Sequence, residues 1–325
     1  MNKLVYILNQ IFSITLTDDY LRYQIKFLGL KLKFPRPSVL IKMKKNPFFK
    51  YKEEGLEIKQ LQKATGQIRD IQLANLAILI EIDKVCKKNN IQYWIDYGNL
   101  LGAIRHKGYI PWDDDIDISM MRQDFENFVD TFEKTVENKD LYLKHICNKK
   151  GSYILKVAHK KCKYLFVDIF IYDYCQKGLN EEEKILYTDE LDMMRTEFLE
   201  NLEFSDGWDL YNKYRALRAE VQKDLDLNNP QQLDLMYYIE FGHQPYVRKN
   251  WVMPYDDIFP LKEIEYEGLK FPTVNKPHEH LVEVFGKNYM EYPKKIDFGH
   301  GAYAPLSQKD KSVIKELIEK SGVSE

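Results

Sequence analysis

The spacing of hydrophobic residues predicts three helices in the first 140 residues. Residues 1–16 place apolar side chains at helical spacing with polar interruptions, a pattern typical of a short amphipathic helix. Residues 56–90 carry the longest helical pattern, and Asn75 is the one polar residue on its apolar face. A third pattern covers 125–136. We expect the helix over 56–90 to be a scaffold that packs behind the central strands.

Alternating and β-branched runs predict about five strands between residues 91 and 172. The expected strands cover 91–96, the acidic segment that ends near residue 118, 141–146, 153–158 and 164–172. Because these strands are interleaved with helices, the sequence predicts an α/β (α+β) fold with a mixed sheet at its core.

The sequence changes character after residue 179, where long charged helical stretches replace the strand patterns. Asn228-Asn229-Pro230 breaks this region before another expected helix. Residues 262–274 are typical of a hairpin that turns at Glu267-Gly268, and helices are expected around 278–285 and from about 309. We therefore expect an N-terminal extension (1–55), a core (56–178), a helical insertion (179–245) and a C-terminal closing segment (246–325).

The net charge of −2 excludes a globally basic nucleic-acid binder, but the charge is unevenly distributed. Residues 20–52 contain ten Lys and Arg residues and no acid, and subtracting this +10 from −2 leaves −12 for the rest of the chain. The apolar pattern of 1–16 is too short and interrupted to span a bilayer. Either its helix packs on its own domain, or residues 1–52 make peripheral contact with an anionic membrane surface.

The four cysteines are scattered without a CxxC or any other metal-ligand spacing. They are Cys86, Cys147, Cys162 and Cys175. This spacing favours reduced thiols in a cytoplasmic protein over disulfides.

The most informative stretch is residues 91–121, IQYWIDYGNLLGAIRHKGYIPWDDDIDISMM. On a strand, Asp115 and Asp117 point to one face while Ile116 and Ile118 point into the core. Two carboxylates on one face of a half-buried strand repel each other unless a cation lies between them. Mg²⁺, a hard cation that takes oxygen ligands, meets this requirement.

The residues before this strand predict a phosphate site. Gly98 lets the backbone approach a phosphate closely, and the helix after it offers unpaired N–H groups at a positive dipole end. Arg105, His106 and Lys107 follow, and they either lie in a solvated loop or supply the cations that a diphosphate needs. This order along the chain indicates phosphoryl-transfer chemistry: a phosphate-binding turn comes first, then basic residues, and then a strand whose aspartates can bind a metal ion.

The run YGNLLGAIRHKGYIPWDDDIDI resembles the signature of the LicD/fukutin family, which has a nucleotidyltransferase-type fold. Gly98 matches the glycine of the family's Gly-Ser/Thr turn, and Asp115 and Asp117 match its D-x-D pair. Asp168, in LFVDIFIYD, matches the later aspartate. Asn99 stands where the family usually has Thr or Ser, and its amide can still donate to a phosphate. The similarity runs from about residue 66 to about residue 300.

The resemblance implies that residues 56–178 form a nucleotidyltransferase-like catalytic core. It implies a Mg²⁺-dependent enzyme, with Mn²⁺ as the alternative ion, that moves a phospho-alcohol, phosphocholine first of all. The donor would be CDP-choline or another CDP-alcohol. The acceptor would be a sugar hydroxyl of a cell-surface glycan, which can be lipid-linked, and the released product would be CMP. Asp115, Asp117 and Asp168 would hold the metal, with Asp168 either completing the metal shell or acting as general base.

Other residues near the motif have two interpretations each. Lys156, together with Lys160 and Lys161, lies before the Asp168 strand and could bind the diphosphate. Trp112, with Tyr97 and Tyr93, belongs either to the core or to an aromatic cage for a quaternary ammonium group. Asp113 and Asp114 are expected to support the site, and Asp173 should point to the other face of its strand.

Two other functions stay open at this stage. A nucleotidyltransferase would move NMP itself to the acceptor. A catalytically silent scaffold in glycan assembly would keep the fold without the chemistry, although the intact set of three aspartates argues against it.

Overall fold

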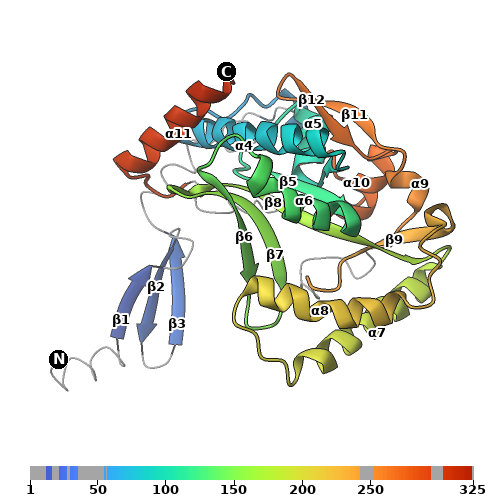
Figure 1. Cartoon of the computed structure of the whole chain (residues 1–325). Coiled ribbons are helices and arrows are strands. Elements are labelled where there is room, and N and C mark those ends of the chain that lie inside the picture. The colour runs from blue at the N-terminus through green and yellow to red at the C-terminus, as the bar shows by residue number, and fades with distance from the viewer. Residues whose placement is uncertain are drawn as a thin grey trace.

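The computed structural model describes residues 55, 57–241, 252–293 and 303–323 in full, and the backbone of 12–16, 22–27 and 30–35. At its centre is a seven-stranded mixed sheet flanked by helices, which confirms the expected α/β fold class (Figure 1). The strands of this sheet are β4 (Trp94–Ile95), β5 (Asp117–Met121), β6 (Leu141–Cys147), β7 (Tyr153–His159), β8 (Cys162–Gln176), β9 (Leu233–Tyr237) and β10 (Val252–Met253).

Helices surround this sheet. Those in the described part of the chain are η1 (Ile58–Gln60), α4 (Gln67–Asn89), α5 (Tyr97–His106), α6 (Arg122–Thr135), α7 (Glu181–Leu199), α8 (Gly207–Gln222), η2 (Pro230–Gln232), α9 (Tyr255–Ile258), α10 (Pro277–Phe285) and α11 (Gln308–Ser321). Helix α11 lies along α4, and α8 packs on β6 and β7 (Figure 1). Among the residues described, no helix has the length and apolar character needed to cross a membrane.

The longest strand, β8, organises the sheet. It pairs in parallel with β5, where Asp117 stands opposite Asp168. Strand β8 also forms an antiparallel pair with β7, in which Lys156 stands opposite the same Asp168. Because one residue has both partners, β5 and β7 lie on opposite edges of β8. Strand β9 joins β8 further along.

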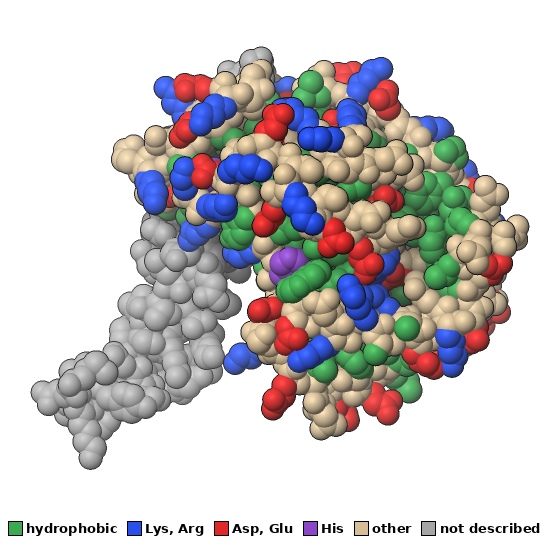
Figure 2. All heavy atoms as spheres, viewed as in Figure 1, with side chains coloured by type: hydrophobic (Ala, Val, Ile, Leu, Met, Phe, Trp, Pro, Cys, Tyr) green, Lys and Arg blue, Asp and Glu red, His purple; other side chains and the backbone are tan. Residues whose placement is uncertain are grey.

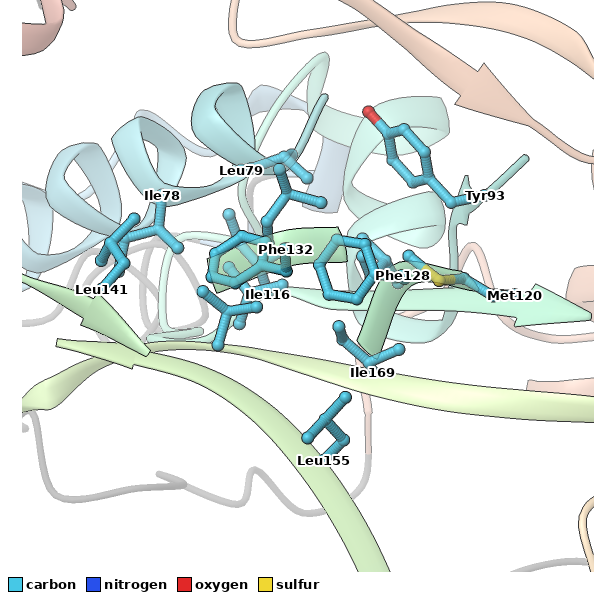
Figure 3. Packing of buried hydrophobic residues seen from close by; sticks show 14 of the residues in the cluster. Ile78, Leu79, Tyr93, Ile116, Met120, Phe128, Phe132, Leu141, Leu155 and Ile169 are labelled. Atoms are coloured by element: carbon cyan, nitrogen blue, oxygen red, sulfur yellow. The ribbon is translucent and has the colours of Figure 1, made fainter. Parts of the chain in front are cut away.

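One face of the sheet carries the main hydrophobic core. Figure 3 shows Ile169 of β8 and Leu155 of β7 beneath Phe128 of α6 and Ile78 of α4. All four side chains are fully buried. The helix predicted over 56–90 is therefore confirmed as a scaffold, although as an α-helix it begins only at Gln67.

The opposite face packs against a second cluster, in which residues from the first 172 positions meet residues from the C-terminal part of the chain. This cluster includes α10 and lies next to a hairpin of β11 (Lys262–Tyr266) and β12 (Leu269–Thr273). Tyr172 of β8 and Leu281 of α10 are fully buried in it. Asp168 belongs to this second face, because it alternates with the core-facing Ile169.

The N-terminal strands form a three-stranded antiparallel sheet in the order β1 (Phe12–Leu16), β2 (Arg22–Phe27) and β3 (Leu30–Pro35). The helix expected over 1–16 is therefore wrong for residues 12–16, and the rest of that prediction lies outside the described residues. The FSITL segment alternates apolar and hydroxyl residues, a composition that suits a strand once a partner strand is available.

Two further expectations are wrong in detail. The segment after Asn229 is not a helix but a 3₁₀ turn followed by β9, which pairs with β8. Strand 91–96 shortens to β4, and the aspartates at 113–115 precede β5 instead of lying on it. Long-range pairing decides both cases, and single-sequence patterns do not record it.

Several other elements occur where the patterns predict them. These are α6, β6, β7, β8, the hairpin, α10 and α11. Glu267 and Gly268 have φ values of +52° and +76°, the left-handed pair that a tight two-residue hairpin turn requires.

Candidate active site

Three aspartates from two neighbouring strands meet on the second face of the sheet. Asp115 and Asp117 come from the loop before β5 and from its first residue, and Asp168 comes from β8. Each offers a carboxylate oxygen, and these oxygens lie within 4.8 Å of one another. Asp115 and Asp168 are buried, and Asp117 is half-buried. The structure thus brings together Asp115 and Asp117, which the residue pattern indicates, and Asp168, which the family resemblance implies.

The donor set fits a hard divalent cation. All three ligands are carboxylate oxygens, which suit Mg²⁺ or Mn²⁺ and not a metal that prefers sulfur or imidazole. Asp113, Asp114 and Asp115 satisfy the same 4.8 Å criterion, so five aspartates share one acidic region.

Asn99 supports the D-x-D segment from behind. Its Oδ1 accepts a 2.6 Å hydrogen bond from the backbone N–H of Asp117. Its Nδ2 donates to the carbonyl of Asp115 at 3.2 Å and to the Tyr266 hydroxyl at 2.9 Å. The side chain is 2% exposed. These contacts use both amide protons, so Asn99 positions Asp115 and Asp117 in this structure.

Helix α4 holds the preceding loop with buried amides. Asn75 Nδ2 donates to the carbonyl of Asp114 at 2.9 Å, and its Oδ1 accepts from the N–H of Phe166 on β8 at 3.0 Å. Gln72 Nε2 donates to the carbonyl of Asp113 at 2.8 Å. Asn75 therefore ties the acidic loop to the strand that carries Asp168.

Helix α5 begins beside the acidic loop. Its N-cap is Asp96, whose Oδ1 accepts from the Tyr97 N–H at 2.8 Å. Gly98 follows in the first turn, where a Cβ would lie 2.8 Å from Asp113 Oδ2. The group that approaches the glycine closely here is an aspartate of the acidic region.

Asp96 was not selected from the sequence, although an aspartate directly before a helix is a known capping signal. It is fully buried, and its Oδ1 lies 2.6 Å from Nε2 of His280 on α10. Burial alone would raise the pKa of Asp96. The charge and hydrogen bond of His280, together with hydrogen bonds from the Ser119 hydroxyl and the Tyr97 N–H, outweigh burial and lower that pKa. The pair links α5 to the C-terminal segment.

Lys156 is the predicted cation that reaches the aspartates. Its Nζ lies 2.8 Å from the Asp168 carboxylate and 3.7 Å from the centre of the Phe166 ring. The side chain is 17% exposed. An ammonium in this position offsets part of the repulsion among the three carboxylates.

Unlike Lys156, the basic residues Arg105, His106 and Lys107 make other contacts than a hydrogen bond to the three aspartates. Arg105 is buried and donates to the carbonyl of Tyr289 at 2.8 Å and to His106 Nε2 at 2.9 Å. Burial lowers the pKa of Arg105 to about 10 against the opposing effect of Asp113. Lys107 is exposed at the left-handed C-cap of α5.

The three aromatic residues near the motif lie inside the protein. Trp112 is 7% exposed and belongs to the second hydrophobic cluster, and Tyr97 packs edge-on against Phe170 at 4.9 Å. Tyr93 is buried, and its hydroxyl donates to Asp83 on α4. Their placement matches the core-packing interpretation.

Comparison with known proteins gives the family. A family model described as LicD/FKTN/FKRP, nucleotidyltransferase domain, matches residues 90–209. The lipopolysaccharide cholinephosphotransferase LicD of Haemophilus influenzae is 33% identical over 264 residues, which cover 71% of this chain and 94% of the relative. The chain belongs to the LicD family. Among shorter matches, the human ribitol 5-phosphate transferase FKRP is 42% identical over 43 residues, which cover 13% of this chain and 9% of the relative.

An uncharacterized Rickettsia prowazekii protein, RP689, is 37% identical over 102 residues, covering 30% of this chain and 38% of the relative. The range that the family model matches, 90–209, contains the three aspartates and Lys156. It does not contain the residues that support the site from the C-terminal segment. Tyr266, which bonds Asn99, and His280, which bonds Asp96, both lie beyond its end. Two of the residues that support the candidate site, Asn99 and Asp96, therefore contact residues outside the matched region.

Asp173 is separated from the LicD aspartates, as its position on β8 predicts. Its carboxylate accepts from Arg122 Nε at 2.9 Å, and the same guanidinium bonds Glu240. Both acids are buried, so this network is part of the packing behind the sheet.

Proposed function

We propose that this LicD-family protein transfers a phospho-alcohol, phosphocholine first of all, from a CDP-activated donor to a sugar hydroxyl of a cell-surface glycan. The observation that carries the proposal is the set of three carboxylates within 4.8 Å, in a chain that shares 33% identity with a lipopolysaccharide cholinephosphotransferase.

In the proposed reaction the acceptor hydroxyl oxygen attacks the phosphorus that bears the alcohol. The bond from that phosphorus to the bridging oxygen breaks, and CMP leaves with the electron pair. A Mg²⁺ ion held by Asp115 and Asp117 would neutralise charge on the diphosphate. Asp168 would either accept the hydroxyl proton or add a ligand to that ion while the proton passes to solvent, and Lys156, 2.8 Å from its carboxylate, would orient it.

Isothermal titration with CDP-choline, CDP-ribitol and CDP-glycerol, with and without Mg²⁺, tests this function on the wild type and Asp117→Ala. Binding of one donor that requires Mg²⁺ and disappears in the variant would support the proposal and identify the alcohol. Absence of binding to all three donors would overturn it and favour the scaffold function.

The description of the family model as a nucleotidyltransferase domain favours one second candidate, the transfer of NMP to the acceptor. A donor labelled in both halves separates the two reactions. Label from the alcohol half on the acceptor supports phospho-alcohol transfer, whereas label from the nucleoside half supports the alternative.

We also propose that residues 1–52 bring the enzyme to an anionic membrane when the acceptor is lipid-linked, because ten cations and no acid lie within 20–52. Deletion of 1–52 should abolish binding to vesicles that contain an anionic lipid. Unchanged binding would contradict this role.

A further inference from the structure

A groove lined by lysines lies beside the three aspartates. Its volume is about 660 Å³, and it is formed by β6, β7, the start of β8 and the first turn of α11. We call it the lysine groove, and its cations are Lys144, Lys156, Lys160, Lys161, Lys163 and Lys309. Asp310 is the one acid among the residues that line it.

The lysine groove and the aspartates share one face of the sheet. In register, Lys144 of β6 stands opposite Lys156 of β7, Lys156 opposite Asp168 of β8, and Asp168 opposite Asp117 of β5. Residues opposite each other on neighbouring strands point to the same face, and each step is about 4.8 Å. A row of four charged side chains therefore runs without interruption from two cations to two anions.

Several of the lysines already have partners. Lys156 contacts Asp168, Lys160 donates to the carbonyl of Lys139 at 2.6 Å, and Lys161 pairs with Asp140 at 2.5 Å. Lys163 Nζ lies 5.2 Å from the centre of the Tyr164 ring. Lys144, Lys163 and Lys309 are exposed, and Lys309 lies at the positive end of the α11 dipole. Figure 2 shows one face of the molecule, on which acidic and basic side chains are interspersed.

We infer that the lysine groove receives phosphate groups of the acceptor glycan while its reacting hydroxyl lies at Asp168. The inference rests on the proposed function and names the chemistry of the second substrate. Strand β8, which carries Asp168, lies between β5 and β7 in the sheet. A donor held by Asp115 and Asp117 would therefore lie on the side of Asp168 that faces β5. The β7 side, which opens into the lysine groove, is left for the acceptor.

The acceptor is the better occupant than the donor for a geometric reason. In-line transfer needs the attacking hydroxyl and the leaving CMP on opposite sides of the phosphorus. The lysine groove would hold an acceptor on the side of Asp168 away from the donor, so that the two substrates approach from opposite edges of one strand.

The test uses the full chain and a triple variant, Lys144→Gln with Lys163→Gln and Lys309→Gln. The matched control is Lys88→Gln with Lys134→Gln and Lys287→Gln, three lysines that are exposed and lie outside the groove. Two probes are titrated: the soluble oligosaccharide of deacylated lipopolysaccharide, and the same preparation after removal of its phosphates. CDP-choline with Mg²⁺ is titrated in parallel.

We expect the wild type and the control to bind the phosphorylated oligosaccharide about tenfold more tightly than the dephosphorylated one, with a difference that shrinks at high salt. The groove variant should lose this preference and bind CDP-choline as the wild type does. A retained preference in the variant, or no preference in the wild type, would overturn the inference. A parallel loss of CDP-choline binding would assign the groove to the donor instead.

The proposed function fails separately, through absence of donor binding in the wild type. In that case the oligosaccharide titrations still decide whether the groove binds phosphate.

Discussion

The side-chain oxygen of Asn99 accepts a 2.6 Å hydrogen bond from the backbone N–H of Asp117. The same side chain donates to the carbonyl of Asp115, so one buried amide bonds the backbone at both ends of the D-x-D segment. Side chains that orient metal ligands are as much a part of a metal site as the ligands themselves. Asn99 therefore controls where the two carboxylates point, although it offers no ligand of its own.

Asn99→Ala should weaken Mn²⁺ binding about 10- to 100-fold, because Asp115 and Asp117 lose the bonds that fix their backbone. Isothermal titration with Mn²⁺ measures the change. Asn89→Ala is the matched control, since Asn89 is a half-buried asparagine in α4 whose amide bonds the Val85 carbonyl away from the site. Equal Mn²⁺ affinity in the wild type and Asn99→Ala would show that Asn99 has no positioning role.

Lys156→Met removes the ammonium next to Asp168 and leaves three carboxylates within 4.8 Å. In EDTA we expect the free energy of unfolding to fall by about 2 kcal/mol, because a mostly buried ion pair is broken. Saturating Mg²⁺ should reduce the difference in the free energy of unfolding between the wild type and Lys156→Met. The reason is that the ion stabilises the folded state more when no lysine competes for Asp168.

Thermal unfolding of both proteins with EDTA and with Mg²⁺ measures this effect. Lys161→Met, which removes an exposed lysine from its pair with Asp140, should change stability little under either condition. An unchanged melting temperature of Lys156→Met in EDTA would mean that Lys156 does not neutralise the site.

The chemistry-bearing residues could be selected from the sequence because they follow local rules. Asp115 and Asp117 are two residues apart next to buried isoleucines, a spacing that predicts a shared face, and their carboxylates do converge although Asp115 precedes β5. Asp168 was assigned by the family resemblance, and the strand around it follows from its own apolar run. Lys156 was one candidate among several lysines, and only the antiparallel register of β7 and β8 places it opposite Asp168.

The supporting residues could not be selected in this way, because their partners are distant in the chain. His280 meets Asp96 across 184 positions, and Tyr266 meets Asn99 across 167. The roles expected for Arg105 and His106 depended on the direction of the last turn of α5, which turns both side chains inward. Helix spacing does not give that direction without the packing of the C-terminal segment.

Gly102→Ala should destabilise the fold strongly. A Cβ at this position would lie 2.3 Å from the backbone oxygen of Gly108 and 3.2 Å from the N–H of Ile110, and neither atom can move without the loop. We expect a loss of about 3 kcal/mol in the free energy of unfolding, measured by urea titration.

Gly98→Ala is the matched comparison in the same helix. Its Cβ would meet only the end of the Asp113 side chain, which can rotate, and alanine favours a helix by about 1 kcal/mol over glycine. The midpoint of urea unfolding of Gly98→Ala should therefore lie close to that of the wild type. Equal destabilisation of the two variants would show that the contact with Gly108 is not the reason for glycine at position 102.

His106 gives the protein a stability that depends on pH. Burial, together with the neighbouring Arg105, lowers the pKa of His106 to about 3 from an ordinary value of 6.5. The neutral ring accepts the Arg105 N–H at Nε2, which it can do only without a proton there. Between about pH 6.5 and pH 3 the unfolded chain therefore binds a proton that the folded chain does not.

Stability should consequently rise with pH across this window and be lost as the pH falls through it, by at most about 1.4 kcal/mol per pH unit from this residue. His106→Gln keeps an acceptor for Arg105 but cannot titrate. Urea unfolding of both proteins at pH 7, 6, 5 and 4 isolates the effect, because the carboxylates that also titrate are common to both. The wild type should lose more stability on acidification than the variant, and parallel curves would contradict the buried neutral state of His106.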